Sequence, residues 1–257
     1  MLADPYDAIL LDLDGVLYRW PEPIAGAREA VERLRAAGKG VAFVTNNSSR
    51  TPEQVVERLA SVGVAADPAE VVTSALATAT LLRERGVSSA FVIGEDGLRT
   101  ALAAAGIRLI DVRDHGPVDA VVVGFDRSAD YAKLRDAAVL VASGAALIAS
   151  NPDPSFPAPG GEAWPGAGAL LAAVRTTTGA TAEVVGKPAA PILRRALARA
   201  GGGRPLVVGD RLDTDIAGAE ALGWDSALVL TGSSSREDLD GSAWSPTYVV
   251  DALADLA

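Results

Sequence analysis

Near its N-terminus the chain reads Ala8-Ile9-Leu10-Leu11-Asp12-Leu13-Asp14-Gly15, four apolar residues followed by two carboxylates and a glycine. A short, continuously apolar run predicts a buried strand of a parallel sheet. Residues two apart on an extended chain project from the same face, so Asp12 and Asp14 would lie side by side at the end of that strand. Two adjacent acids suit a nucleophile beside a proton donor, or a magnesium site, because oxygen ligands suit that hard cation. A calcium-binding loop is excluded, since Leu17 and Pro23 stand where such a loop needs Gly and Glu.

The same order of apolar run, turn and longer helical pattern recurs along the chain, as it does where helices join parallel strands. The predicted strands span 8–11, 41–44, 90–93, 120–123, 146–149, 183–185, 206–208 and 227–230. The predicted helices span 26–37, 52–62, 74–85, 131–141, 168–177, 191–200 and 214–222. Between Ser150 and Pro165 the chain has too many Pro and Gly residues for regular structure, which predicts a long irregular loop. The fold class is therefore α/β.

Polar clusters follow four of the predicted strands. They are Asp12–Asp14, Thr45–Ser49, the Gly186-Lys187-Pro188 turn, and the stretch from Gly209-Asp210 to Asp215. Ligands of open α/β sheets bind at the carboxyl ends of the strands, so the four clusters would converge on one crevice. The stretch between the second and third clusters is much longer than one sheet needs there. We therefore expect a discontinuous core, residues 1–84 and 182–257, with an inserted α/β domain at 85–181.

Each cluster taken alone also has a structural explanation. The polar residues from Thr45 to Ser49 are typical of a turn, and a lone lysine such as Lys187 is usually a solvated surface charge. Asp213 and Thr214 are ordinary N-cap residues, and an acid in the first turn of the following helix would be favourable. Asp210 precedes that turn, so capping does not explain it.

Composition narrows the function classes further. The 257 residues include 23 basic and 33 acidic side chains, for a net charge of −10, and 49% are hydrophobic, which is typical of a globular protein. An acidic surface repels phosphate backbones and anionic lipids, so neither nucleic acid nor a membrane is an expected partner. The absence of cysteine excludes disulfides, thiolate zinc sites and cysteine nucleophiles. The single histidine, His115, is expected in an exposed loop, and the lack of a signal-peptide pattern predicts a cytoplasmic protein.

Together the four clusters resemble the motifs of the haloacid dehalogenase superfamily phosphatases. The motifs are Asp12-Leu13-Asp14-Gly15-Val16-Leu17-Tyr18, Thr45-Asn46-Asn47-Ser48, Gly186-Lys187-Pro188, and Gly209-Asp210 with Asp215. The resemblance is strongest to the branch that contains NagD and the 4-nitrophenyl phosphate, phosphoglycolate and glycerol-3-phosphate phosphatases. It implies a Rossmann-like core with an inserted C2-type α/β cap domain. Trp20 departs from the pattern, because glycine is expected after the nucleophile loop.

The resemblance also implies a role for each acid. Asp12 would be the nucleophile that forms an aspartyl-phosphate, and Asp14 would protonate the leaving alcohol and then activate water. Mg²⁺ would bind the carboxylates of Asp12 and Asp210 and the backbone carbonyl of Asp14. Asp215 would reach the ion through water or support its ligands.

The remaining motif residues would hold the phosphoryl group. Thr45 and the amide of Asn46 would bind its oxygens with help from Asn47, and Lys187 would steady both Asp12 and the transferred group. A phosphate monoester carries about two negative charges near neutral pH, so without Mg²⁺ and Lys187 it would be repelled by the carboxylates.

In the proline-rich loop of the inserted domain, the candidate substrate contacts are Asn151 and Asp153, with Phe156 and Trp164 beside them. Anchoring of the loop is an equally good interpretation of the two aromatic residues. A large cap domain favours small phosphorylated metabolites over phosphoproteins. The resemblance also implies a homodimer that pairs through the cap.

These expectations define a Mg²⁺-dependent phosphomonoesterase acting on a small phosphorylated metabolite. Glycerol 3-phosphate and phosphoglycolate are the first candidates, and 4-nitrophenyl phosphate is a convenient surrogate. Phosphomutase and phosphotransferase activities stay open because they use the same acid and the same intermediate. A non-catalytic protein that binds phosphorylated metabolites is a third alternative. Such a protein would be expected to lack one of the motif acids or the motif lysine, and this chain has all of them.

Overall fold

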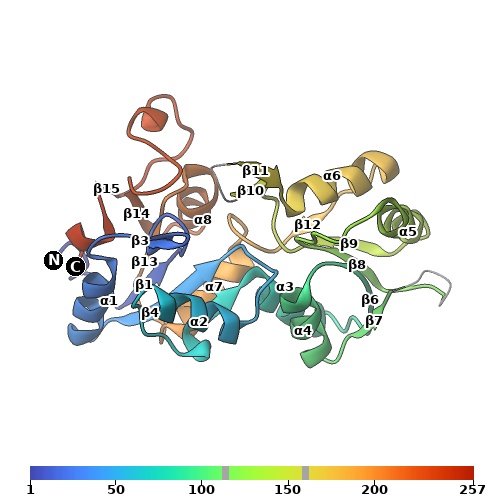
Figure 1. The fold of residues 1–257 in the computed structure, drawn as a ribbon, viewed down its shortest axis with the longest axis horizontal. Helices are drawn as coiled ribbons and strands as arrows, with labels where there is room; N and C mark the ends of the chain where they lie inside the picture. The colour runs from blue at the N-terminus through green and yellow to red at the C-terminus, as the bar shows by residue number, and fades with distance from the viewer. Residues whose placement is uncertain (112–115, 158–161) are drawn as a thin grey trace. The chain divides into compact units, whose positions relative to one another are not determined.

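A computed structural model describes residues 1–111, 116–157 and 162–257, which divide into two compact units (Figure 1). The core unit consists of residues 1–45, 52–72 and 187–257, and the cap unit of residues 46–51 and 73–186. The domain boundaries expected from the sequence, after residues 84 and 181, stay a prediction. The expectation for His115 falls outside the described residues.

The sheet of the core unit brings together strands from both ends of the chain. Its order is β15 (Tyr248–Val250), β14 (Asp225–Val229), β13 (Pro205–Gly209), β1 (Ala8–Leu11), β4 (Gly40–Thr45) and β5 (Val71–Thr73). β1 pairs in parallel with both β13 and β4, and β14 pairs in parallel with β13 and β15. The four residues of β1 are all buried, as their continuous apolar character predicts.

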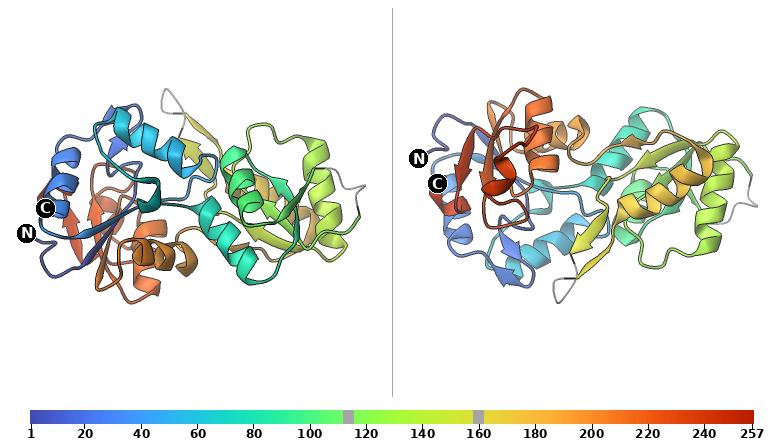
Figure 2. Two further views of the ribbon diagram at one scale, coloured as in Figure 1. Left: turned by 90° about the horizontal axis from the view of Figure 1, so that it is seen from below. Right: turned by 90° about the horizontal axis from the view of Figure 1, so that it is seen from above.

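Helices cover both faces of this sheet, with α1 on one side and α7 and α8 on the other (Figure 2). The helices are α1 (Ala27–Ala36), α2 (Pro52–Ser61), α7 (Ala190–Arg199) and α8 (Ala217–Ala221), and a short hairpin of β2 (Tyr18–Arg19) and β3 (Glu22–Pro23) follows β1. α1 buries Ala27, Ala30, Val31 and Leu34, a helical spacing that directs one face into the core. Short helical turns lie at Pro68–Glu70, Leu212–Ile216, Glu237–Leu239 and Leu253–Asp255.

The cap unit has its own sheet and its own apolar core. Its parallel strands run in the order β12 (Glu183–Val184), β9 (Ala146–Ala149), β8 (Ala120–Val123), β6 (Ser89–Ile93) and β7 (Arg108–Ile110). Helices α3 (Ser74–Glu84) and α4 (Asp96–Ala104) lie on one face, and α5 (Tyr131–Ala142) and α6 (Ala167–Thr178) on the other (Figure 1). Each of the two units therefore combines a parallel sheet with helices, and the predicted α/β fold class is confirmed.

The structure corrects one expectation about local structure. The stretch from Ser150 to Pro165 contains an antiparallel pair, β10 (Ser155–Pro157) with β11 (Ala163–Pro165), where an irregular loop was predicted. A proline at a strand end is compatible with pairing because its missing N–H is not needed there. β12, the strand before Lys187, pairs with β9 in the sheet of the cap unit. Strand pairing is a long-range property that the apolar pattern of a segment does not encode.

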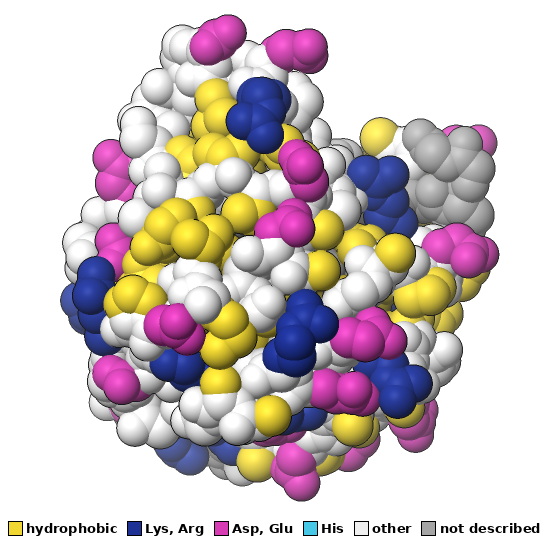
Figure 3. All heavy atoms as spheres, turned by 90° about the vertical axis from the view of Figure 1, so that its left-hand side faces the viewer, with side chains coloured by type: hydrophobic (Ala, Val, Ile, Leu, Met, Phe, Trp, Pro, Cys, Tyr) yellow, Lys and Arg dark blue, Asp and Glu magenta, His cyan; other side chains and the backbone are white. Residues whose placement is uncertain are grey.

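On the face drawn in Figure 3, described Lys and Arg side chains are scattered among Asp and Glu. No helix in the described residues combines the length and the apolar character needed to cross a bilayer.

Candidate active site

The site begins at the carboxyl ends of two neighbouring strands of the core unit. In the sheet, Leu11 of β1 is aligned with Val208 of β13, and the N–H of Asp12 donates to the carbonyl oxygen of Val208 at 2.9 Å. Asp12 and Asp210 therefore leave the sheet at the same edge, one from each strand. The topological rule for parallel sheets predicts this convergence.

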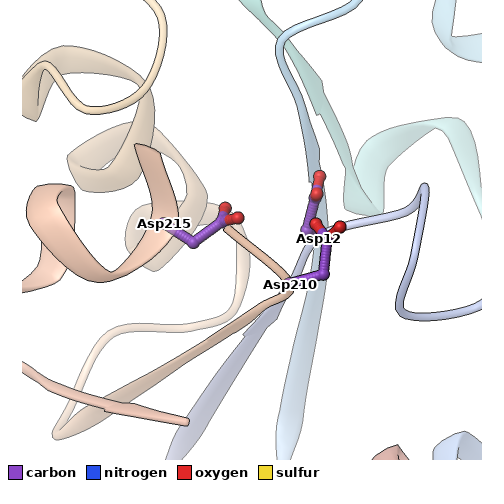
Figure 4. A group of neighbouring side chains, drawn as sticks. All are labelled: Asp12, Asp210 and Asp215. Atoms are coloured by element: carbon purple, nitrogen blue, oxygen red, sulfur yellow. The ribbon is translucent and has the colours of Figure 1, made fainter. Parts of the chain in front are cut away.

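A third acid joins them from the helical turn after β13. One carboxylate oxygen from each of Asp12, Asp210 and Asp215 lies within 4.8 Å of the others, and the carboxylate of Asp215 points toward the two strand ends (Figure 4). Within the described ranges this is the one group of three or more acidic or histidine side chains that could hold a metal ion. Asp14 is not part of it, and its side chain is 46% exposed. Its predicted roles as proton donor and as backbone ligand are left open by this arrangement.

The segment that carries Asp215 differs from the expected helix cap. The helical turn spans Leu212–Ile216 and its N-cap is Arg211, so Asp213 and Thr214 lie inside the turn and do not cap it. Asp213 forms an exposed ion pair with Arg211 at 2.8 Å. The turn directs Asp215 inward, where it is buried. Asp215 therefore belongs to the site, although its position alone would also be explained by a favourable interaction with the first turn of a helix.

Lys187 lies among these acids. Its Nζ is 2.7 Å from Oδ1 of Asp12 and 2.6 Å from Oδ1 of Asp215, and its side chain is only 3% exposed. The interpretation of Lys187 as a solvated surface charge is therefore wrong. A buried lysine retains its charge only when carboxylates compensate for the lost hydration.

Burial and mutual repulsion control the protonation of the group. Burial raises the pKa of Asp12 and of Asp215 to about 6, although the Lys187 ammonium acts in the opposite direction. The pKa of Asp210 is also raised, first by burial and then by the charge of Asp215. For Lys187, burial would lower the pKa, but the charges of Asp12 and Asp215 raise it well above its usual range. The site therefore carries more negative than positive charge near neutral pH.

Two glycines allow the acids to approach so closely. A Cβ on Gly209 would lie 2.1 Å from Cγ of Asp215, and a Cβ on Gly232 would lie 2.1 Å from Oδ2 of Asp210. The backbone N–H of Ser233 donates to the same Asp210 oxygen at 2.6 Å. Gly232 and Ser233 were missed from the sequence, because a Gly-Ser turn so far along the chain carries no local signal of this contact.

The donor set fits the predicted cofactor. Two buried carboxylates and the 12%-exposed carboxylate of Asp12 supply only oxygen ligands, and one lysine leaves the group with excess negative charge that a divalent cation would neutralise. The space at Gly209 and Gly232 is taken up by the carboxylates themselves, so each acid is held against backbone. The residues present therefore match a hard cation such as Mg²⁺.

The predicted phosphate and substrate residues divide between the two units. Thr45 is the last, buried residue of β4 in the core unit. In the cap unit, Asn46 Nδ2 donates to Asp153 at 3.2 Å, and Asn151 Nδ2 donates to the carbonyl oxygen of Asn46 at 2.7 Å. The Oδ1 of Asn47 accepts from the N–H and the hydroxyl of Ser49, which closes a turn. Asn46, Asn151 and Asp153 are thus brought together.

Ser74 adds a contact to this loop that the sequence did not suggest. Its hydroxyl donates to the carbonyl oxygen of Asn46 at 2.6 Å, so two side chains share that acceptor. Trp164, one of the aromatic candidates, is exposed and donates from Nε1 to Glu162 at 2.8 Å. These contacts do not indicate that Trp164 binds a substrate.

Comparison with known proteins decides the family. A family model described as haloacid dehalogenase-like hydrolase matches residues 9–108, and one described as HAD-hydrolase-like matches residues 184–256. An acid sugar phosphatase from Staphylococcus aureus is 41% identical over 258 residues, covering 98% of both chains. The chain belongs to the haloacid dehalogenase-like hydrolases. The predictions of this family and of a phosphatase within it are therefore confirmed.

Solved structures agree with this hydrolase over nearly its whole length. NagD from E. coli is 33% identical, with a TM-score of 0.90 and 98% of each chain covered. A glycerol phosphate phosphatase from Mycobacterium tuberculosis, solved in complex with magnesium, is 37% identical with a TM-score of 0.93, covering 99% of this chain and 77% of that chain. The expected Rossmann-like core and the NagD-like branch are confirmed by these similarities.

Proposed function

We propose that this hydrolase is a Mg²⁺-dependent phosphomonoesterase that acts on small sugar or glycerol phosphates through an aspartyl-phosphate. The observation that carries the proposal is the placement of Asp12 against Lys187 and within 4.8 Å of two further carboxylates. Similarity to an acid sugar phosphatase and to a glycerol phosphate phosphatase supports the substrate class. Glycerol 3-phosphate and phosphoglycolate are the specific candidates.

Asp12 is the nucleophile in this mechanism. Its carboxylate oxygen forms a bond to phosphorus while the bond from phosphorus to the substrate oxygen breaks, and the phosphoryl group passes to the enzyme. Lys187 holds Asp12 at 2.7 Å and places a positive charge beside the transferred group. Because the lysine is buried, its charge acts through little water, which strengthens its effect on the reacting oxygens.

Asp14 acts first as the general acid and then as the general base. It gives a proton to the leaving alcohol in the first step and takes one from the attacking water in the second, which returns the free carboxylate of Asp12 and inorganic phosphate. Its partly exposed side chain is able to exchange protons with solvent between steps.

The carboxylates of Asp12 and Asp210, the backbone carbonyl of Asp14 and, less directly, Asp215 would hold Mg²⁺. When bound, the ion supplies positive charge that offsets the phosphate and the acids. Thr45 and the N–H of Asn46 would bind phosphoryl oxygens, while Asn151 and Asp153 fix the loop that carries Asn46.

The test is hydrolysis of 4-nitrophenyl phosphate by the wild type with Mg²⁺, by the wild type with EDTA, and by Asp12→Asn with Mg²⁺. We expect activity only in the first. Equal rates in all three would reject the proposal. A panel of sugar phosphates, glycerol 3-phosphate and phosphoglycolate then ranks substrates, and phosphate release measured beside transfer to an added alcohol separates hydrolysis from phosphotransfer.

A further inference from the structure

An arginine on α2 contacts the turn that follows the predicted nucleophile. The guanidinium carbon of Arg58 lies 4.0 Å from the ring centroid of Trp20 and 4.9 Å from that of Tyr18. The two rings meet edge to face, with centroids 6.0 Å apart and an interplanar angle of 80°. A guanidinium over an aromatic face is held by the ring quadrupole, most strongly by tryptophan. Arg58 is therefore fixed in place by the β2–β3 hairpin.

The same guanidinium faces Asp14. Nη2 of Arg58 is 4.0 Å from Oδ1 of Asp14, a separation that allows attraction between charges but exceeds hydrogen-bond distance. The Arg58 side chain is only 11% exposed, and within the described part of the chain its Nε has no hydrogen-bond partner. Burying an arginine donor without a partner is unfavourable. Its position is explained by the two rings and by the charge of Asp14.

Hydrogen bonds connect the turn after Asp14 to the β2–β3 hairpin and to Thr231. The N–H of Gly15 donates to the carbonyl oxygen of Tyr18 at 2.8 Å, and the hydroxyl of Thr231 donates to the carbonyl oxygen of Gly15 at 2.6 Å. The Asp14 backbone is thus fixed by hydrogen bonds to its neighbour Gly15, and its side chain is 46% exposed. A fixed positive charge nearby restricts the directions that the carboxylate takes.

Trp20 supplies the ring that lies closer to Arg58. The family resemblance predicts glycine at that position, and glycine would offer no ring to Arg58. The exposed tryptophan at the hairpin tip consequently has a specific partner in the structure.

We propose that Arg58, held by Trp20 and Tyr18, is a positioning residue that orients the carboxylate of Asp14 for proton transfer to the leaving group. The inference rests on the proposed function, since it needs Asp14 to act as the acid. General acid–base catalysis contributes about 10²–10⁴-fold, and only when the acid lies within hydrogen-bond reach. Misdirecting Asp14 would therefore slow esters whose leaving group needs a proton, and would affect good leaving groups much less.

Two aryl esters of nearly the same shape test this. Phenyl phosphate has a poor leaving group that needs protonation, whereas 4-nitrophenyl phosphate releases a stable anion. The measurement is kcat/KM for both esters with Mg²⁺, because it reports the steps up to departure of the alcohol. In Arg58→Met we expect the ratio of 4-nitrophenyl to phenyl phosphate kcat/KM to rise about tenfold over the wild type, a fraction of the full acid contribution. Arg58→Lys keeps the charge and should give a smaller rise.

Trp20→Leu is the second variant, because it removes the aromatic face and leaves Arg58 in the chain. We expect the ratio of the two kcat/KM values to rise in this variant as well, so the proposal can still be tested if Arg58→Met does not fold. Arg204→Met is the matched control. Arg204 also stacks on a ring, Tyr6 at 4.9 Å, and pairs with Asp225 at 2.7 Å, but it precedes β13 at the opposite edge of the sheet. Its ratio should equal that of the wild type.

The outcomes separate the two proposals. A wild type that hydrolyses neither ester overturns the proposed function itself. A wild type that hydrolyses both, with Arg58→Met and Trp20→Leu slowing both esters by the same factor, overturns the positioning role and assigns Arg58 to stability alone. A ratio that rises in these variants and not in Arg204→Met supports it.

Discussion

Replacing Lys187 by methionine should destabilise the core unit sharply when no divalent cation is present. The substitution keeps the length of the side chain and removes the one ammonium that contacts Asp12 at 2.7 Å and Asp215 at 2.6 Å. Asp215 and the lysine are buried and the Asp12 side chain is only 12% exposed, so water replaces little of the lost charge. The variant thus leaves one buried and one largely buried acid without their cation.

The size of the effect follows from that burial. Removing one partner of a buried ion pair costs about 3–5 kcal/mol, because the remaining charge stays desolvated. For a domain of this size, such a loss lowers the unfolding midpoint by on the order of 10 °C. Exposed pairs such as Arg28 with Glu32 would contribute far less, because water screens their charges.

The pH dependence of the loss has a definite sign. The pKa of Asp12 and of Asp215 is raised to about 6 in the folded protein, against an ordinary value of 3.8. Acids with a raised folded pKa contribute stability at low pH, and that stability is lost as the pH rises through the folded pKa. Without Lys187 both pKa values rise further, so the deficit of the variant should be larger at pH 8 than at pH 5.

The assay is thermal unfolding of wild type and Lys187→Met in EDTA at both pH values, repeated with MgCl₂. Lys133→Met is the control, since Nζ of Lys133 is also 2.7 Å from a buried carboxylate, that of Asp126, in the cap unit. We expect MgCl₂ to reduce the deficit of Lys187→Met and to leave that of Lys133→Met unchanged. An unfolding midpoint of Lys187→Met in EDTA equal to that of the wild type would contradict this prediction.

Two further predictions concern single contacts. Gly209→Ala should displace Asp215, because the new Cβ would lie 2.1 Å from Cγ of that residue, at an overpacking cost of about 1–3 kcal/mol. We therefore expect MgCl₂ to raise the unfolding midpoint of this variant less than that of the wild type. An equal rise in both proteins would contradict this prediction. In the cap unit, hydroxyls and N–H groups of Ser88 and Ser89 donate to Asp119 and lower its pKa to about 2. The ionised Asp119 therefore contributes to stability above its ordinary pKa, and this contribution is lost as the pH falls through about 2. Asp119→Asn should unfold at a lower urea concentration than the wild type at pH 7, and the difference should close between pH 4 and pH 2. A difference that is independent of pH would exclude this contribution of the Asp119 charge.

The strands and their buried character were predictable because they depend on local pattern. β1, β8 and β9 have the bounds expected from their apolar runs. The acids Asp12 and Asp210 follow strands of one parallel sheet, so the rule for carboxyl ends located them without coordinates. Short elements such as β7 and β15 were missed, since three residues carry too weak a periodicity.

The pattern of residues was enough to predict an α/β chain of this hydrolase family with acids at two strand ends. That Lys187 is buried between Asp12 and Asp215, and that Arg58 lies near Asp14, became apparent only in the folded molecule. The difference arises from the range of the interactions. Local periodicity records which residues leave water, but an ion pair or a ring contact forms between segments that packing alone brings together, and no residue pattern on either segment specifies its partner.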